Sequence, residues 1–231
     1  MATFDELHTE AHRRSLIRKA IKSIAFIRKK DADNKPIETL FAGPGAFIDL
    51  KSEGWLPIGL VTDDGYEFGR DTNVDEITSH GFANPTRKDV VSVERSVKTT
   101  IQEYGKRHVE ELLQGSDLSG VTQDPTTGEV VTDEQDLPTP GAYELLVVAM
   151  DGPVDQRWYL GKFFPSVQLS EASEEAWGKE GAIEREVTFD VFTDEELGFP
   201  VRHFIGGPAA AASKDVLGYD AAAPAEASSE G

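Results

Sequence analysis

An alternating pattern over residues 90–104, VVSVERSVKTTIQEY, constrains the fold of this chain more than any other feature. The side chains in one register of this run are Val91, Val93, Arg95, Val97, Thr99, Ile101 and Glu103. A period of two, with mostly polar residues in the other register, is typical of a half-buried β-strand. Residues 105–115 then predict a short amphipathic helix ending at Gly115, because glycine readily adopts the left-handed conformation after a helix.

Other β-prone runs indicate that strands dominate the rest of the chain. They are residues 143–150 (YELLVVAM), 157–171 (RWYLGKFFPSVQLSE) and 185–197 (REVTFDVFTDEEL). The pair Asp64-Gly65 lies between two β-prone runs and predicts a tight hairpin at 58–69. Residues 16–24 have helical spacing, but residues 21–28 also fit a strand, so the pattern leaves this segment open.

These patterns predict a mainly β fold, an antiparallel β-sandwich or barrel with one packed α-helix, a long loop and flexible terminal arms. A length of 231 residues with 39% hydrophobic content suits one domain with appendages. We expect a basic N-terminal arm at 1–20 and a β domain at 21–207. Within that domain we expect a long loop at 36–58 and an acidic insertion at 116–141. Residues 208–231 are rich in Ala, Ser and Gly, which predicts a disordered tail, removable from about Ala209 without loss of the fold.

Charge is segregated along the chain. Residues 13–30 carry eight basic and no acidic side chains, and residues 110–140 carry eight acidic and no basic ones. The net charge of -19 disfavours tight binding to nucleic acid or to an anionic membrane. The chain contains no cysteine, which excludes disulfides and thiolate metal sites. We expect neither a signal peptide nor a membrane-spanning segment, since no uncharged apolar run approaches the required length of about 18 residues.

The sequence offers no convincing catalytic, cofactor or metal site. His8 and His12 have helical spacing, but they lack the HExxH order of a zinc site, and a third ligand is missing. The run GPGAF at 43–47 lacks the Lys-Ser/Thr of a phosphate-binding loop, and Asp63 and Asp64 lack the spacing of a calcium loop. Because the chain also lacks a GxSxG motif, we expect a protein without enzymatic activity and without cofactors.

The order of these elements resembles the major tail proteins (tail tube proteins) of siphophages, especially those of actinobacteriophages. The amino-terminal part of the resemblance runs from GWLPIGLVTDDGYEF through VVSVERSVKTTIQEY to GKRHVEELLQG. The carboxy-terminal part runs from RWYLGKFFPSVQLSEASEEAW to AIEREVTFDVFTDEELGFPVRHFIGG. The first of these runs contains a Phe-Pro dipeptide, and the second ends with the pattern G-x-x-V-R-x-F. The resemblance covers about residues 21–207. Departures from the family are the basic first 20 residues, the acidic insertion and the absence of an added Ig-like domain.

This resemblance implies a structural virion protein that forms hexameric rings stacked into the tail tube, the conduit for genome delivery. Its partners would be other copies of itself, the tape measure protein and the tail terminator and tip proteins. The subunit would assemble in the cytoplasm of the bacterial host and remain in the virion tail. DNA would pass through transiently without tight binding, because a lumen lined by carboxylates repels phosphates. Two other hypotheses are a β-sandwich binding module, such as a virion decoration or tail-tip adaptor protein, and an enzyme on a β scaffold.

Within this hypothesis two sets of residues are candidates for function. Large apolar side chains in the glycine- and proline-rich loop are expected to contact a neighbouring ring: Phe41, Phe47, Trp55 and Leu56. The alternative for this loop is that it folds over its own domain. Carboxylates expected to face the lumen are Glu94, Glu103, Glu184 and Glu186.

Overall fold

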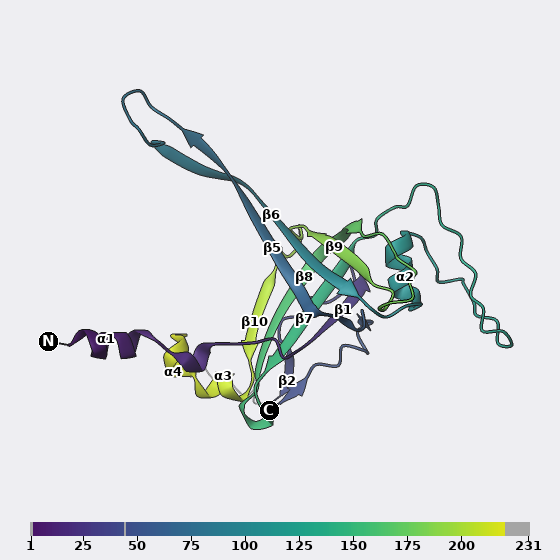
Figure 1. Ribbon diagram of the computed structural model, residues 1–231, viewed down its shortest axis with the longest axis horizontal. Helices are drawn as coiled ribbons and strands as arrows, with labels where there is room; N and C mark the ends of the chain where they lie inside the picture. Colours follow the sequence, from purple (N-terminus) through teal and green to yellow (C-terminus); the bar gives the residue numbers. More distant parts are fainter. Residues whose placement is uncertain (1, 44, 220–231) are drawn as a thin grey trace, which may run out of the picture.

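The computed structural model describes residues 2–43 and 45–219 (Figure 1). The strands are β1 (Lys22–Lys29), β2 (Phe41–Gly43), β3 (Ala46–Phe47), β4 (Leu56–Pro57), β5 (Val61–Ile77), β6 (Arg87–Ile101), β7 (Tyr143–Asp151), β8 (Trp158–Ala172), β9 (Arg185–Val191) and β10 (Arg202–Gly206). The α-helices are α1 (Phe4–Ala11), α2 (Arg107–Gln114), α3 (Pro208–Ala212) and α4 (Lys214–Leu217), with 3₁₀ turns η1 (Arg14–Leu16) and η2 (Val154–Gln156). The fold is therefore mainly β, as predicted, and the expected helix ends at Gly115 in the left-handed conformation.

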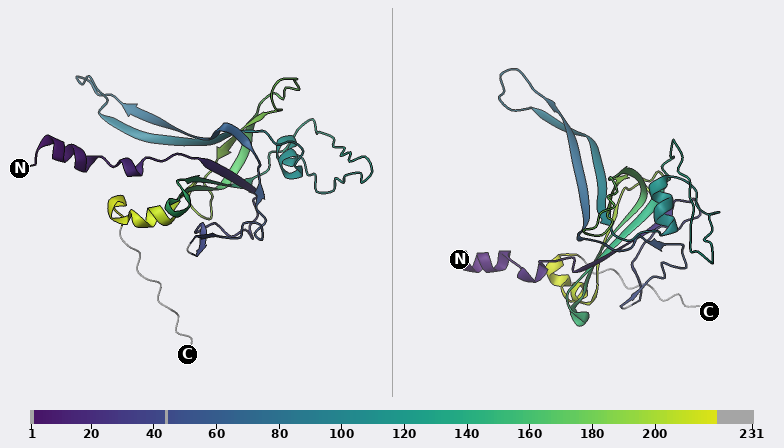
Figure 2. Two further views of the ribbon diagram at one scale, coloured as in Figure 1. Left: turned by 60° about the horizontal axis from the view of Figure 1, so that its bottom comes forward. Right: turned by 45° about the vertical axis from the view of Figure 1, so that its right-hand side comes forward.

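Eight of the strands form one antiparallel sheet in the order β4-β1-β7-β8-β9-β6-β5, with β10 as an additional neighbour of β8. Strand β8 is long enough to pair with β10 along its first half and with β9 along its second half. The terminal strands β4 and β5 do not pair with each other, so the curved sheet is open (Figure 2). The sheet therefore does not close into a barrel, one of the two forms expected, whereas the mainly β antiparallel fold with a packed helix is confirmed.

The main core lies on the concave side of the sheet, where helix α2 covers one end. Its buried apolar residues come from β1, β6, β7, β8, β9 and α2 and include Val97, Ile101, Leu145, Val167 and Phe189. The alternation predicted for β6 thus has a physical cause, because Val97, Thr99 and Ile101 all point into this core. Arg185 fixes α2 to β9, since its guanidinium pairs with Glu110 at 2.8 Å and donates to the Glu103 carbonyl at 3.0 Å.

A second core lies on the opposite face of β1, β7 and β8. It is formed by Ile37, Leu40, Trp55, Leu146, Val148 and Phe163. The Trp55 ring packs edge-on against Phe163, with centroids 6.1 Å apart, and the Arg28 guanidinium lies 4.5 Å above it. The 36–58 loop therefore folds over its own sheet. The expectation that Trp55 contacts a neighbouring ring is wrong, because only 2% of this residue is exposed.

Strands β5 and β6 form a long hairpin that leaves the body of the sheet (Figure 1). The hairpin predicted at 58–69 is wrong, since β5 continues through this segment to Ile77 and the chain reverses between Ile77 and Arg87. Gly65 does have the positive φ expected of it, +69°. It occupies an irregularity in the β5–β6 pairing, between Val61 and Tyr66, rather than a turn.

The N-terminal arm and the helices α3 and α4 lie on the same side of the sheet (Figure 1). The N-terminal arm carries α1 and η1 and joins the body where Arg18 pairs with Asp151 at 3.3 Å. The expectation of disorder is wrong for residues 208–217, because they form α3 and α4, and Ala210 is buried. Residues 220–231 of the predicted tail lie outside the described residues. Among the described helices, none has the length and apolar character needed to cross a bilayer.

Candidate assembly surfaces

The outer part of the β5–β6 hairpin is exposed on both faces. Every residue from Glu67 to Val91 is exposed except Pro85, which is half-buried. Apolar side chains are distributed along it, among them Ile77, Phe82 and Val90, with Phe82 at the tip 69% exposed. An isolated two-stranded ribbon is at best marginally stable in water, so this hairpin is a candidate for contact with a partner.

Like charges face each other across the same hairpin. In the register of β5 and β6, Arg70 is opposite Arg95, Asp71 is opposite Glu94, and Asp75 is opposite Asp89. Direct cross-strand pairs of like charge destabilise a sheet, whereas opposite charges contribute about 0.2–1 kcal/mol. The hairpin contains opposite pairs too, such as Glu76 with Lys88. Asp89 also pairs with Arg87 at 2.6 Å, so the hairpin is a charged ribbon that combines repulsive and attractive pairs.

An acidic face covers the outer side of β5, β6, β9 and the end of β8. Six carboxylates and one lysine share this face: Glu67, Asp71, Glu94, Glu171, Glu186, Asp190 and Lys98. Lys98 lies among them and pairs with Glu186 at 3.0 Å. The hydrogen bond and charge of Glu186, together with the charges of Glu67 and Glu171, raise the pKa of Lys98. This face is the polar counterpart of the main core, because residues alternate between the two faces along each strand.

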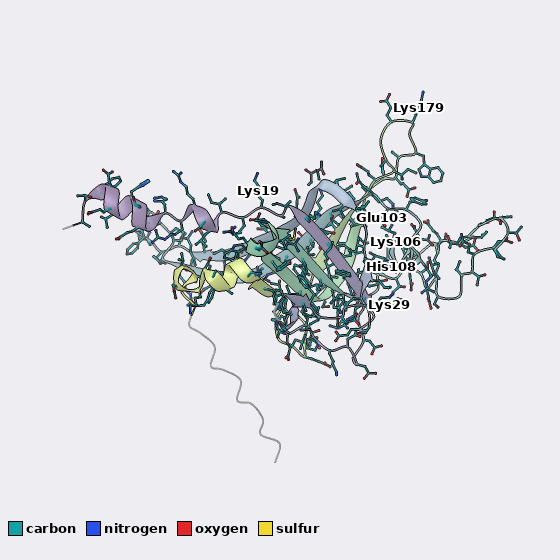
Figure 3. The ribbon with its side chains drawn as sticks, turned by 90° about the horizontal axis from the view of Figure 1, so that it is seen from below. Lys19, Lys29, Glu103, Lys106, His108 and Lys179 are labelled. Atoms are coloured by element: carbon teal, nitrogen blue, oxygen red, sulfur yellow. The ribbon has the colours of Figure 1, made fainter. Side chains whose placement is uncertain are left out.

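The four predicted acidic residues do not all lie on this face. The strands bring Glu94 and Glu186 there, and Glu184 lies just before β9, where it accepts a hydrogen bond from Gln102 at 2.9 Å. Glu103 lies beyond the end of β6 and turns toward α2, where it pairs with Lys106 at 2.5 Å (Figure 3). Hydrogen bonds from Lys106 and from the Leu60 backbone lower the pKa of Glu103.

Sequence reasoning missed Glu67, Asp71 and Glu171 as members of the acidic face. A signal for Glu67 and Asp71 was present, because they alternate with Tyr66 and Phe68 in β5. The hairpin predicted at 58–69 concealed that alternation. Glu171 could only be placed once the β8–β9 register was known.

The remaining candidate contact residues of the 36–58 loop are partly accessible. Phe41 and Phe47 pack edge-on against Tyr159 in an aromatic group, in which the Phe47 and Tyr159 ring centroids are 4.8 Å apart. Phe47 remains 38% exposed and Leu56 41% exposed. Contact of these side chains with a neighbouring copy stays a prediction.

A groove of about 800 Å³ lies between the start of β1, residues 57–66, β8 and β10. Lys162 and His203 face each other across β8 and β10 at one end of it. The Lys162 ammonium lies 3.6 Å from the centroid of the Phe68 ring, and burial lowers its pKa. Tyr66 also lines the groove, and its buried hydroxyl has no hydrogen-bond partner among the described residues.

Across residues 2–43 and 45–219, no three His, Cys, Asp or Glu side chains lie close enough together to hold a metal ion. His8 and His12, considered above as a possible pair of ligands, stack with ring centroids 4.3 Å apart on the exposed arm. His108 lies in α2, with its Nε2 2.9 Å from the Pro57 carbonyl oxygen (Figure 3).

No protein-family model matches this chain, and no curated protein matches it. Among solved structures, it is similar to a chain of the anti-feeding prophage baseplate, solved by cryo-electron microscopy with sixfold symmetrisation. That similarity has a TM-score of 0.41 at 6% identity and covers 81% of this chain and 93% of the other. It is also similar to a chain of the SPP1 tail tube, with a TM-score of 0.36 at 14% identity, covering 87% of this chain and 89% of the other.

Proposed function

We propose that this chain is a structural subunit of a phage tail, which polymerises as stacked hexameric rings into the tube through which the genome leaves the virion. The order of strands and helix that resembles siphophage major tail proteins supports this role. The surfaces of the chain support it independently, because they are suited to contact with further copies and carry no assigned chemistry.

The β5–β6 hairpin is the observation that carries the proposal. Residues 67–91 project from the body with both faces uncovered, and three like-charge pairs lie across the hairpin between residues 70 and 95. Such a ribbon is stabilised when it lies on another protein surface that buries Phe82 and its apolar neighbours. A second copy is the occupant we propose, because a contact between unlike patches of identical chains repeats without closing and so builds stacks.

The acidic face fits the wall of a DNA conduit. DNA carries dense negative charge, so six carboxylates on a regular sheet repel it and keep it from adhering. We therefore propose that the face containing Glu94 and Glu186 lines the lumen. Glu103 does not belong to this face, because its carboxylate is held by Lys106.

Negative-stain microscopy of the purified protein, at increasing concentration and with phage assembly partners, tests the proposal. We expect tubes of uniform bore. The variant Ile77→Ser/Phe82→Ser/Val90→Ser is expected to keep its melting temperature and form no tubes. Val154→Ser, an equally exposed apolar change outside the hairpin, is the matched control and should assemble normally. Isolated particles under every condition would contradict the proposal.

The lumen assignment has a separate test. Charge reversal at Glu94, Glu186 and Asp190 to Lys should leave tubes assembled but make duplex DNA adhere in a salt-dependent manner. Reversal at Asp33, Glu38 and Glu195, which are exposed elsewhere, is the control. Tubes that bind DNA no better after the first change than after the second would show that this face is not the lumen wall.

The groove favours a second candidate, a binding module that acts as a decoration or tail-tip adaptor protein. Its 800 Å³ volume, apolar floor and the Lys162 ammonium, beside which burial and the Lys162 charge lower the pKa of His203, would suit an apolar peptide bearing a carboxylate. A protein of this kind would form a discrete complex instead of a tube, so the same microscopy separates the two candidates.

A further inference from the structure

Two segments of this chain carry opposite charge and have few contacts with the rest of the subunit. We call residues 2–21 the basic arm, because residues 13–21 carry four cations and no carboxylate, although Asp5, Glu6 and Glu10 precede them, and we call residues 116–141 the acidic loop. Within the described residues, no hydrogen bond or ion pair links residues 2–17 to any other part of the chain. The acidic loop contains neither helix nor strand, and it protrudes beyond α2.

The cations of the arm and its flank are unpaired, with one exception. Arg18 contacts Asp151 and stacks 4.2 Å above the Trp158 ring, which anchors the arm to the body. In the part of the chain that the structure describes, Arg13, Arg14, Lys19 and Lys22 form no ion pair with a carboxylate. Lys19 extends from the arm into solvent (Figure 3).

The carboxylates of the acidic loop also lack cationic partners among the described residues. They are Asp117, Asp124, Glu129, Asp133, Glu134 and Asp136. The tip of the loop nevertheless forms a hydrogen-bonded turn. In it, Asp124 accepts hydrogen bonds from the Thr126 and Thr127 backbone N–H groups at 2.7 and 2.8 Å.

Both segments also expose apolar side chains. In the acidic loop, Val131 is 68% and Leu137 86% exposed, and in the arm Ile17 is 72% exposed. The two surfaces therefore complement each other in apolar character as well as in charge, a combination suited to a protein contact.

The arm and the loop extend from opposite sides of the sheet in every view (Figures 1 and 2). Within one chain they are therefore too far apart to meet. Between two copies, the same arrangement brings the arm of one subunit to the loop of the next, and the contact repeats from copy to copy.

We propose that the basic arm of one copy binds the acidic loop of a second copy and joins subunits head to tail. This inference rests on the proposed self-assembly and names a contact that drives it. The arm cations pair with Glu129, Asp133, Glu134 and Asp136, while Ile17 packs near Val131. Exposed ion pairs contribute little singly, so several must act together, and the contact weakens as salt is added.

Cross-linking tests the contact directly, because the chain has no native cysteine. Lys19→Cys and Glu134→Cys are made in separate chains, mixed and treated with a short bismaleimide. We expect a mixed cross-linked dimer, identified by mass spectrometry. Lys19→Cys mixed with Glu38→Cys is the control and should give only background. A yield no higher than this control would overturn the proposal, whether or not the protein forms tubes.

Charge exchange tests whether the contact drives assembly. Reversing Arg13, Arg14 and Lys19 to Glu, or Asp133, Glu134 and Asp136 to Lys, should raise the concentration needed for assembly by at least about tenfold. Mixing the two variants should restore assembly, because each reversed segment then meets its complement. Melting temperatures should not change, since the reversed side chains are all exposed and form no ion pair among the described residues.

The outcomes separate this proposal from the proposed function. If the unaltered protein forms tubes and both reversed variants form them equally well, the arm–loop contact is wrong and the tube proposal stands. If the unaltered protein forms no tube, the tube proposal fails, and cross-linking still decides the contact. If arm reversal abolishes binding to duplex DNA but leaves assembly intact, the arm is a nucleic-acid contact and our proposal is overturned.

Discussion

The sheet of this protein is built from two unequal parts. The central parts of strands β1, β7 and β8 are covered on both faces by their own chain, and the six residues from Tyr143 to Val148 are all buried. The outer hairpin of β5 and β6 is covered on neither face. The first part is stabilised within the subunit, whereas the second exposes apolar groups and like-charge pairs that contact with another molecule would stabilise.

The largest expected difference between the two parts is the cost of removing an aromatic ring. Phe163 is fully buried between β7, β10 and Trp55, so Phe163→Ala should lower the free energy of unfolding by about 3–5 kcal/mol. Phe82→Ser at the hairpin tip should change it by less than about 0.5 kcal/mol. Urea unfolding of both monomeric variants measures the difference, and equal losses would show that the hairpin tip packs on its own subunit.

A smaller effect is expected at Asp194, in the segment that follows β9 and closes over the covered part. Burial alone would raise its pKa, but hydrogen bonds from Lys30 and from the Leu197 and Glu196 backbones lower it below 3.8. Because the pKa of Asp194 is lower in the folded than in the unfolded protein, the carboxylate stabilises the fold at pH values above its unfolded-state pKa. That stabilisation is lost as the pH falls through the folded-state pKa.

We therefore expect Asp194→Ala to cost about 1–2 kcal/mol at neutral pH, because buried backbone donors lose their acceptor. The difference between variant and unaltered protein should shrink below pH 3.8. Unfolding measured across the acid range checks this. A difference that does not depend on pH would mean that the carboxylate charge plays no part.

The boundary between the two parts lies near Tyr66. Its buried hydroxyl lacks a partner among the described residues, so Tyr66→Phe should stabilise the subunit by about 1 kcal/mol. Burial raises the pKa of Tyr66 to about 12, above its ordinary 10.0. The stability of the subunit is therefore unaffected by Tyr66 titration below pH 10 and falls as the pH rises toward 12, where the unfolded chain ionises first. The phenylalanine variant should lack this fall. Ultraviolet titration and alkaline unfolding measure both effects, and an ordinary tyrosine titration would contradict the burial.

The smallest effect is expected within the hairpin. Asp71→Lys turns a like-charge pair with Glu94 into an opposite pair and should stabilise the ribbon by about 0.2–1 kcal/mol. Amide hydrogen exchange in the monomer should slow in residues 67–76 and stay unchanged in β7. Asp71→Asn, which removes only the repulsion, should give part of the effect. Faster exchange in the Asp71→Lys variant would show that the like charges do not destabilise the hairpin.

Sequence reasoning succeeded where neighbouring residues determine the structure. The alternation in β6 and the glycine that ends α2 both depend on contacts within a few residues, and both predictions are confirmed. The conformation of Gly65 was also anticipated, because a positive φ is a property of the residue itself.

The errors arose where distant segments decide the outcome. Gly65 lies in an irregularity of a long strand because β6 continues past it as a partner, which no local pattern encodes. Trp55 is buried because β8 brings Phe163 beneath the loop. Residues 208–217 form short helices that rest near η2 and β10, although their composition indicated disorder. Of the four carboxylates predicted to face the lumen, Glu94 and Glu186 lie on the acidic face. Strand register, and not composition, determines which carboxylates lie there.

Hydrogen exchange of the hairpin in the free subunit and in the assembled protein tests the central claim most directly. We predict fast exchange of amides 67–93 in the monomer and strong protection after assembly, with little change in β7. Hairpin amides that exchange equally fast in monomer and assembly would contradict the claim that a second copy covers this ribbon.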